Sequence, residues 1–476
     1  MDSRIGARAL AVALGAWRTR EPAYEALADG IRLLCLDNRI APRTTLPAER
    51  ELATILGLSR ATIAAAYRSL RESDHVESVR GSGTVTLPLG RRTIATTRVG
   101  DDEIDLQQAS PAAWPGLAGV MTDVAQDAAA LVARAGYDVV GHERLREAIA
   151  ARYDQRGLPT SADEILVTTG AQSAIHLLAT TLLRRGDPVL IETPTYPHAT
   201  EALRGAGARL VSVPVDAEAG WDLDRARQAF ARTRPSLAYL MPQFQNPTGR
   251  TMSETECAAV AEAAARAGTV LVVDETTAEL YVEPPATAHP PLPFDGCEGA
   301  VVRLGSLGKT VWGGLRIGWI RADRDTVRRL VAARAPRDLG TPEFEQVVAA
   351  RLLARMPEIL AQRSTLLRAG RDALVSGLRA RLPEWRVPVP AGGVAVWAEL
   401  GAPLSSPLVI AARERGLHLS PGARFAVDGG HDRRLRLPFT ASVDHLTRAV
   451  DILAETWPRV REAAPVATVD VFDAVV

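Results

Sequence analysis

The sequence predicts an α/β protein of two domains, a small helical domain followed by a much larger one built on a mostly parallel sheet. Three observations lead to this prediction. The chain has 476 residues, which is too long for one ordinary domain. Residues 20–88 show helical patterns and a short hairpin, whereas helical and strand patterns alternate from 106 to 460. Residues 89–105 mix charged and small side chains without periodicity, which is typical of a linker.

The large domain is expected to span 106–460, with a small C-terminal α/β subdomain from about 345 to 460 and a tail over 461–476. Its alternation is visible in three pairs of segments. A helix predicted over 145–157 precedes a strand over 164–169, and a helix over 174–186 precedes a strand over 188–193. A further helix over 257–268 precedes a strand over 269–275. Such alternation favours a parallel sheet flanked by helices.

The bulk composition excludes several classes of protein. Apolar residues make up 47% and charged residues 24%, as in a soluble globular protein. No apolar run is long enough to cross a membrane, and residues 1–20 lack the pattern of a secretory signal. Cys35, Cys257 and Cys297 are odd in number and far apart, which argues against disulfides or a zinc site. We therefore expect a cytoplasmic protein with no membrane partner and no metal.

Residues 20–88 have the pattern of a winged helix-turn-helix. Helices are predicted over 21–38, 46–58 and 59–74, and two strands within 75–87 are joined by a Gly-Ser-Gly turn. Ser59 is a good N-cap for the third helix, whose first residues would meet the base edges in the major groove. Arg60 can pair bidentately with guanine, and Thr62 suits a phosphate. The net charge is zero, so any contact with DNA must be local.

The stretch LPAERELATILGLSRATIAAAYRSL, with VRGSGTV after it, resembles the GntR-type winged helix over most of 20–88. The resemblance implies a double-stranded DNA operator as a partner. The candidate DNA-binding residues are Arg50, Ser59, Arg60, Thr62, Arg80 and Gly81. Ala64 occupies a position where some members have a second base-reading arginine, so the resemblance does not carry over the operator sequence. A helical packing module with surface arginines is the alternative.

Lys309 is the only lysine of the chain, although lysine and arginine together number 56. Arginine carries charge and binds phosphate as well as lysine does, but it does not lose its proton in proteins and so does not attack a carbonyl. A single lysine among arginines therefore indicates a nucleophilic amine that forms a Schiff base. Codon bias with one surviving lysine is the alternative.

The residues around Lys309 fit the requirements of pyridoxal 5′-phosphate (PLP), which needs an amine, an acid at its ring nitrogen and donors for its phosphate. Ser306 precedes the lysine by three residues, and Arg316 returns toward the same phosphate. A strand-to-helix turn offers the amides of Gly170, Ala171 and Gln172 to that phosphate. The remaining candidates are Asp274 for the ring nitrogen, Asn246 for the 3′-oxygen and Tyr196 for the ring face.

Each of these stretches alone is also ordinary turn chemistry, and the prediction rests on their occurrence together and in this order. The set resembles the fold-type I aminotransferases over about 105–460 of this chain. The resemblance implies an internal aldimine at Lys309 and active sites built by two subunits. It also implies that Tyr137 reaches the phosphate of the partner subunit and that Arg436 binds a substrate carboxylate. Thr276 stands where regulators of this type usually have a tyrosine that contacts the 3′-oxygen.

A GntR-type winged helix joined to an aminotransferase-like domain is the architecture of the MocR family of bacterial regulators. The resemblance implies a head-to-tail homodimer that senses an amine, an amino acid or PLP through Lys309. Four other interpretations stay open. They are an active aminotransferase with an autoregulatory head, a sensor of PLP supply, a DNA-binding dimer that has lost the cofactor, and an enzyme with a vestigial head. The sequence therefore leaves enzymatic activity undecided, and full transamination is not expected to be the main role.

Overall fold

The computed structural model describes residues 3–14, 17, 22–36, 40–79, 83–87, 103–133, 135–283, 285, 290, 292–297 and 299–463. Arg80 and Gly81, two of the predicted DNA contacts, lie outside the described residues. So do residue 88, residues 89–102 of the predicted linker and residues 464–476 of the predicted tail. Within the described ranges, no helix is both long enough and apolar enough to cross a membrane.

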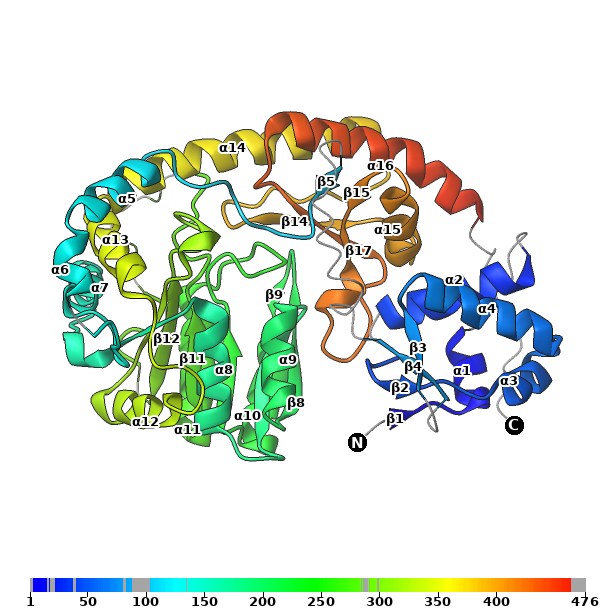
Figure 1. Ribbon diagram of the computed structural model, residues 1–476, viewed down its shortest axis with the longest axis horizontal. Helices are drawn as coiled ribbons and strands as arrows, with labels where there is room; N and C mark the ends of the chain where they lie inside the picture. The colour runs from blue at the N-terminus through cyan, green and yellow to red at the C-terminus, as the bar shows by residue number, and fades with distance from the viewer. Residues whose placement is uncertain are drawn as a thin grey trace.

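The N-terminal domain is a winged helix-turn-helix, as predicted (blue in Figure 1). Its sheet has the order β1-β2-β4-β3, in which β3 and β4 form the predicted hairpin. Residues of the helices and of β3 share one buried core. The described part of the domain includes a strand and a helix that precede the predicted start at 20. Its elements are β1 (Ser3–Arg4), α1 (Ala7–Leu14), α2 (Ala23–Leu36), β2 (Thr44–Thr45), α3 (Glu49–Leu56), α4 (Arg60–Glu72), β3 (Val76–Val79) and β4 (Gly83–Thr86).

The large domain is built on an eight-stranded sheet of order β6-β13-β12-β11-β10-β7-β8-β9 among the described residues. The strands from β12 to β8 pair in parallel, which confirms the predicted sheet. β13 runs antiparallel to both its neighbours, β12 and β6, and β9 runs antiparallel to β8. The strands are β6 (Ile165–Thr168), β7 (Pro188–Thr193), β8 (Arg209–Asp216), β9 (Gly220–Trp221), β10 (Leu237–Leu240), β11 (Val270–Asp274), β12 (Val301–Ser306) and β13 (Gly318–Arg321).

Both faces of this sheet are buried, because alternate strand residues point to opposite sides. Leu237 and Tyr239 of β10 pack in the cluster with α8, α9 and α12, whereas Ala238 and Leu240 pack in the cluster with α10 and α11. A third cluster joins β6 to α5, α7 and α13. The helices are α5 (Leu117–Gln126), α6 (Ala128–Val132), α7 (Glu143–Gln155), α8 (Ala171–Leu182), α9 (Pro197–Gly205), α10 (Leu223–Thr233), α11 (Glu254–Ala267), α12 (Arg324–Arg334) and α13 (Glu343–Leu353).

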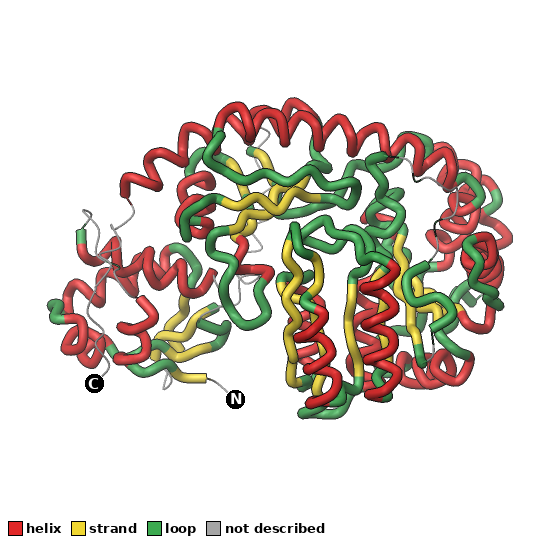
Figure 2. The backbone as a smooth tube through the Cα atoms, turned by 180° about the vertical axis from the view of Figure 1, so that it is seen from behind, coloured by secondary structure: helices red, strands yellow, loops and turns green. Residues whose placement is uncertain are grey.

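The small C-terminal subdomain has an antiparallel sheet of order β14-β17-β16, covered by two long helices that lie across the top of the molecule (Figure 2). Its core also takes in Ile104 and Leu106, which precede α5 in the chain. Ile104 lies in β5 (Ile104–Asp105), and Leu106 follows this strand. β5 lies at the end of the predicted linker and pairs with β15. The other elements are α14 (Met356–Arg381), β14 (Ala395–Glu399), α15 (Ser405–Arg413), β15 (Leu417–His418), β16 (Ser420–Pro421), β17 (Arg434–Pro438) and α16 (Val443–Ala463).

Candidate functional site

Lys309 lies in the connection between β12 and β13, which local hydrogen bonds hold in place. The Ser306 hydroxyl at the end of β12 donates to the main-chain oxygen of Ile317 at 3.1 Å and accepts from the Gly308 amide at 3.0 Å. The Lys309 Nζ atom donates to the main-chain oxygen of Ala109 at 2.7 Å. Burial lowers the pKa of this amine to about 8, with a further contribution from the positive charge of Arg436. Burial therefore favours the neutral, nucleophilic form of this amine.

Asp274 ends β11 and is buried, with 2% of its surface exposed. The Tyr239 hydroxyl donates to its Oδ2 atom, and the Thr276 amide donates to its Oδ1 atom at 2.9 Å. Burial raises the pKa of Asp274, whereas the hydrogen bonds from Tyr239 and Thr276 lower it. These donors favour the carboxylate form, which can hold a proton on a heterocyclic nitrogen. Tyr239 is a site residue that the sequence analysis missed.

The first turn of α8 and Arg316 form a cradle for an anion. Gly170 is the N-cap of α8 at φ 86°, and a Cβ atom there would lie 2.9 Å from Nη2 of Arg316. That guanidinium donates to the main-chain oxygen of Thr169 at 2.9 Å, so it lies beside the free amides of the helix N-terminus. Both features are positive and favour a phosphate group. The structure thus brings Gly170, Ala171, Gln172, Ser306 and Arg316 into one region.

Tyr196 and Asn246 supply polar groups in the same region. The Tyr196 hydroxyl is 3.0 Å from Nδ1 of His198, and burial raises the pKa of Tyr196 to about 12, with Asp274 adding to the effect. Asn246 follows Gln245, whose side-chain amide donates to the main-chain oxygen of Pro194 at 2.6 Å. The Asn246 Oδ1 atom is buried and has no hydrogen-bond partner among the described residues. A buried acceptor without a donor fits a site that is completed by a bound molecule.

Arg436 is buried on β17, 6% exposed, with its guanidinium 4.8 Å from the ring centre of Phe425. It donates through Nη2 to the main-chain oxygen of Gln107, whereas its buried Nε has no partner in the described part of the chain. Burial lowers its pKa to about 10. Tyr137, by contrast, is 75% exposed, so it is not buried with these residues.

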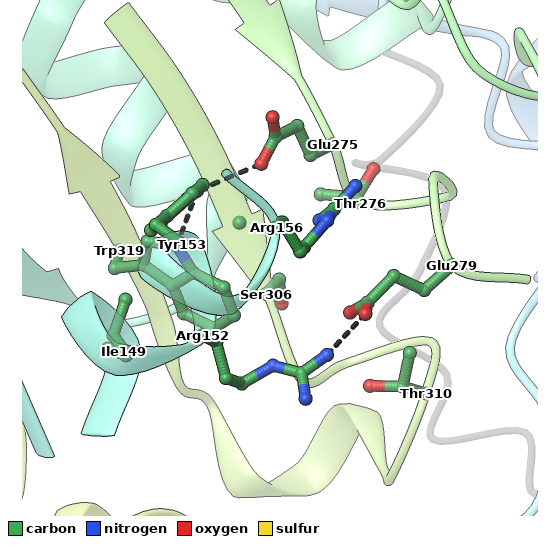
Figure 3. Close-up of a pocket in the computed structure, with 11 residues that line it drawn as sticks. Ile149, Arg152, Tyr153, Arg156, Glu275, Thr276, Glu279, Ser306, Thr310 and Trp319 are labelled. Carbon is green, nitrogen blue, oxygen red and sulfur yellow. Dashed lines mark hydrogen bonds and ion pairs between the residues drawn. The ribbon is translucent and has the colours of Figure 1, made fainter. Parts of the chain in front are cut away.

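A pocket adjoins this site at the turn that follows β11 and at the end of β12 (Figure 3). Thr276 and Ser306, both predicted cofactor contacts, are among its lining residues. Across the pocket, Tyr153 of α7 donates to Glu275 at 2.8 Å, and Arg152 forms an ion pair with Glu279. Glu275 also pairs at 2.8 Å with Arg303 of β12. The Glu275–Arg303 pair ties the strand that carries Asp274 to the strand that leads to Lys309, whereas Tyr153 and Arg152 tie α7 to the turn after β11.

The residues present fit PLP. The neutral fraction of the lysine suits an aldehyde, the hydrogen-bonded Asp274 carboxylate suits a ring nitrogen, and the cradle at Gly170 and Arg316 suits a phosphate. The unpartnered Asn246 Oδ1 and Arg436 Nε leave polar groups for further ligand atoms. The arrangement can therefore hold PLP together with a molecule that carries an amine and a carboxylate.

The predicted DNA-binding residues that the structure describes lie on α3 and α4. The Ser59 hydroxyl caps α4 by accepting from the Thr62 amide at 3.0 Å. Arg60 is exposed, and its Nε atom is 3.4 Å from Oε2 of Glu49 at the start of α3. Arg50 is also exposed on α3. The helix N-terminus and two exposed arginines therefore face solvent.

Comparison with known proteins gives two family matches in succession. Residues 23–85 match the model of the bacterial regulatory proteins of the gntR family, and residues 119–453 match that of the aminotransferases of class I and II. The 2-aminoadipate transaminase of Thermus thermophilus is 34% identical over 284 residues, which cover 58% of this chain and 70% of the relative. The uncharacterized HTH-type transcriptional regulator YisV of Bacillus subtilis is 27% identical over 458 residues, which cover 87% of this chain and 92% of the relative.

The solved structure of the alpha-aminoadipate aminotransferase LysN from Thermus thermophilus superposes with a TM-score of 0.69 at 30% identity. The alignment covers 76% of this chain and 94% of that one, and that structure contains N-(5′-phosphopyridoxyl)-L-leucine. PLP is the cofactor of this domain, in agreement with the residues around Lys309. The chain belongs to the aminotransferase class I and II family and, through the gntR-family domain at its N-terminus, to the MocR family of transcriptional regulators.

Proposed function

We propose that the protein is a DNA-binding transcriptional regulator that senses an amine, an amino acid or PLP itself at Lys309. One observation carries the proposal. The positive charge of Arg436 helps to lower the pKa of the Lys309 amine, and the buried Nε of Arg436 has no partner among the described residues. The same chain has a gntR-family head. The amine suits a carbonyl carbon and the guanidinium suits a carboxylate.

In this proposal each residue of the site contacts one part of the cofactor. Bound PLP supplies an aldehyde for amines and a ring that withdraws electrons. Lys309 is the attachment point, Asp274 holds the proton on the ring nitrogen, and Tyr196 covers a ring face. Asn246 and Thr276 make polar contacts with the 3′-oxygen of PLP. The phosphate contacts are Gly170, Ala171, Gln172, Ser306, Arg316 and the partner subunit's Tyr137.

The head is proposed to read an operator through Arg50, Ser59, Arg60 and Thr62, with Arg80 and Gly81 at the tip of the wing. Two copies of the chain are proposed to pair head-to-tail through their large domains, which would bring two heads to one operator. A ligand regulates such a protein only if it binds one arrangement of the heads better than the other.

Absorbance and DNA binding together test this proposal. The protein incubated with PLP should absorb in the visible range and should yield a peptide containing Lys309 after borohydride reduction. Lys309→Ala and Lys309→Arg should both lose this adduct, and Lys309→Arg keeps the positive charge as the matched control. Wild-type protein that stays colourless with PLP would contradict the proposal, and so would a protein that binds no double-stranded DNA.

An active aminotransferase with an autoregulatory head is the second candidate. The 34% identity to a transaminase over most of the large domain favours it. Thr276 argues against it, because its amide donates to Asp274 and no tyrosine hydroxyl stands at this position for the 3′-oxygen. Multiple turnovers of an amino acid with a keto acid would support the enzyme, whereas a single half-reaction per subunit would support the sensor.

A further inference from the structure

Residues 103–114, which we call the strap, cross the candidate site between the two parts of the large domain. The strap is the first described segment after the head, and it is joined to the head by residues 88–102. In Figure 1 the chain runs from β5 beneath α14 toward α5. The strap therefore connects the linker to the site in sequence and in space.

The two ends of the strap are anchored in different cores. At its start, the amides of Ile104 and Leu106 donate to the main-chain oxygens of Gly416 at 2.8 Å and His418 at 2.9 Å. Both side chains are buried in the small subdomain. At its end, Trp114 is buried in the core of α5, α7 and α13, and its amide donates to Val311 at 3.0 Å. A change in the relative position of the two parts must therefore move the strap.

Between these anchors, the strap uses two main-chain oxygens to satisfy the two groups that would recognise a ligand. The oxygen of Ala109 accepts from Lys309 Nζ at 2.7 Å, and the oxygen of Gln107 accepts from Arg436 Nη2. A peptide oxygen is neutral and accepts here through one bond, whereas a carboxylate is charged and can accept from an arginine through two. The second bond is open, because the buried Nε of Arg436 has no partner among the described residues.

Arg363 of α14 ties the strap to the lysine loop. Its buried guanidinium donates to the main-chain oxygens of Ala112 at 2.9 Å, Thr310 at 3.0 Å and Val311 at 3.0 Å. Thr310 and Val311 directly follow Lys309 in the chain. The same arginine thus holds the strap and the loop of the reactive amine against the long helix that enters the small subdomain.

We propose that the strap is an internal competitor for the effector. Attachment of PLP already takes Lys309 from Ala109. The carboxylate of an amino acid then takes Arg436 from Gln107, and the displaced strap shifts the point at which the linker leaves the body. The effector class is a molecule with both an amine and a carboxylate, because PLP at Lys309 would offer a carbonyl carbon to the amine and Arg436 would offer two hydrogen bonds to the carboxylate. This inference rests on the proposed function and adds the route from the site to the head. Thermodynamic linkage requires that DNA binding change the affinity for the effector by the same factor.

Gln107→Ala tests the competition without touching the buried site. The exposed Gln107 side chain donates through Nε2 to the main-chain oxygen of Leu419 at 3.1 Å, which fastens the strap to the small subdomain. Losing this bond loosens the strap, so that an amino acid displaces it at lower cost. We expect the affinity for the amino acid to rise about 2- to 10-fold, as for the loss of one such hydrogen bond. Gln108→Ala is the matched control, because that side chain is also exposed and makes no hydrogen bond in the described part of the chain.

The measurement uses the full-length protein loaded with PLP and the twenty standard amino acids as probes, followed by absorbance. With any amino acid that shifts the spectrum, hydrogen–deuterium exchange of the peptide covering 103–114 should increase. A peptide covering 143–155 in α7 should not change. The affinity for the operator should change with the same amino acid, and Gln107→Ala without ligand should move toward the liganded value.

The outcomes separate this inference from the proposed function. If an amino acid shifts the spectrum while strap exchange and operator affinity stay constant, the inference is wrong and PLP sensing stands. Equal affinities of wild-type protein, Gln107→Ala and Gln108→Ala would also overturn it. A protein that takes up PLP but shows no spectral change with any of the twenty amino acids would overturn a standard amino acid as the effector. A protein that takes up no PLP would overturn both.

Discussion

The Nζ atom of Lys309 donates a hydrogen bond of 2.7 Å to the main-chain oxygen of Ala109, 200 residues earlier in the chain. The single lysine of the protein is thus held by the segment that follows the linker to the DNA-binding head. Its amine is desolvated and lies near the charge of Arg436, and both effects lower its pKa to about 8. The Lys309 amine is therefore both the reactive group and the donor that contacts the strap. Its protonation can be measured.

Attachment of PLP to the cofactor-free protein should depend on pH through this amine. The rate should rise through about pH 8, because only the neutral amine attacks an aldehyde. Arg436→Gln removes a positive charge. The loss of this charge stabilises the protonated amine, so the profile of attachment rate against pH should move to higher pH. Arg433→Gln removes an exposed charge from the residues just before β17 and serves as the control. Stopped-flow absorbance gives the profiles, and identical curves for all three proteins would exclude this role of Arg436.

Gly170→Ala should weaken PLP binding by about tenfold or more, as expected when a hydrogen bond to a charged group is lost. The new Cβ atom would lie 2.9 Å from Arg316 Nη2 and would push that guanidinium out of the cradle. Gly157→Ala is the matched control, because Gly157 has a similar φ of 87° but open space around it. Both variants should lose about 1–3 kcal/mol of unfolding free energy to backbone strain. Equal PLP affinities of the two variants would show that the cradle does not bind the phosphate.

Glu192→Gln should change how stability depends on pH. Glu192 is fully buried, and burial raises its pKa from 4.5 to about 7 despite hydrogen bonds from Trp221, Gln245 and Met241. The folded protein therefore binds an extra proton between these values, and the stability contributed by this group falls as the pH rises through that window. Between pH 5 and pH 8, the variant should gain on the order of 3 kcal/mol relative to wild type.

Denaturant unfolding of cofactor-free protein at the two pH values measures this gain. Glu414→Gln removes an exposed carboxylate and is the control. A wild-type stability that depends on pH in the same way as that of Glu192→Gln would mean that this carboxyl keeps an ordinary pKa in the folded protein.

Arg60→Ala should weaken operator binding by about 1–3 kcal/mol, the contribution of a bidentate contact to guanine. Arg60 is 68% exposed at the first turn of α4, so its removal should leave the stability of the head unchanged. Arg68→Ala removes an exposed arginine two turns further along the same helix and should cost much less. Fluorescence anisotropy at fixed salt compares the three proteins. An equal loss for both variants would indicate a general charge effect in place of base recognition.

The sequence by itself predicted the elements and the chemistry that are encoded locally. The helices of the head, the Ser59 cap and the parallel strands follow from periodicity and capping chemistry, which act over a few residues. Lys309 was visible because its side chain has a property that arginine lacks. Asp274 and Gly170 were placed by their positions at the end of a strand and the start of a helix. Their proposed contacts with the cofactor stay predictions.

Only the tertiary structure decided how distant segments meet. It inserted the antiparallel β13 into the sheet, brought Tyr239 to Asp274, and buried Glu192 beside Trp221. It also placed the main-chain oxygens of Gln107 and Ala109 where they accept hydrogen bonds from Arg436 and Lys309. Every residue has a main-chain oxygen, so no side-chain pattern marks the ones that serve a site. Their positions depend on how the strap is anchored in two cores far apart in sequence, and that is a property of the packed molecule alone.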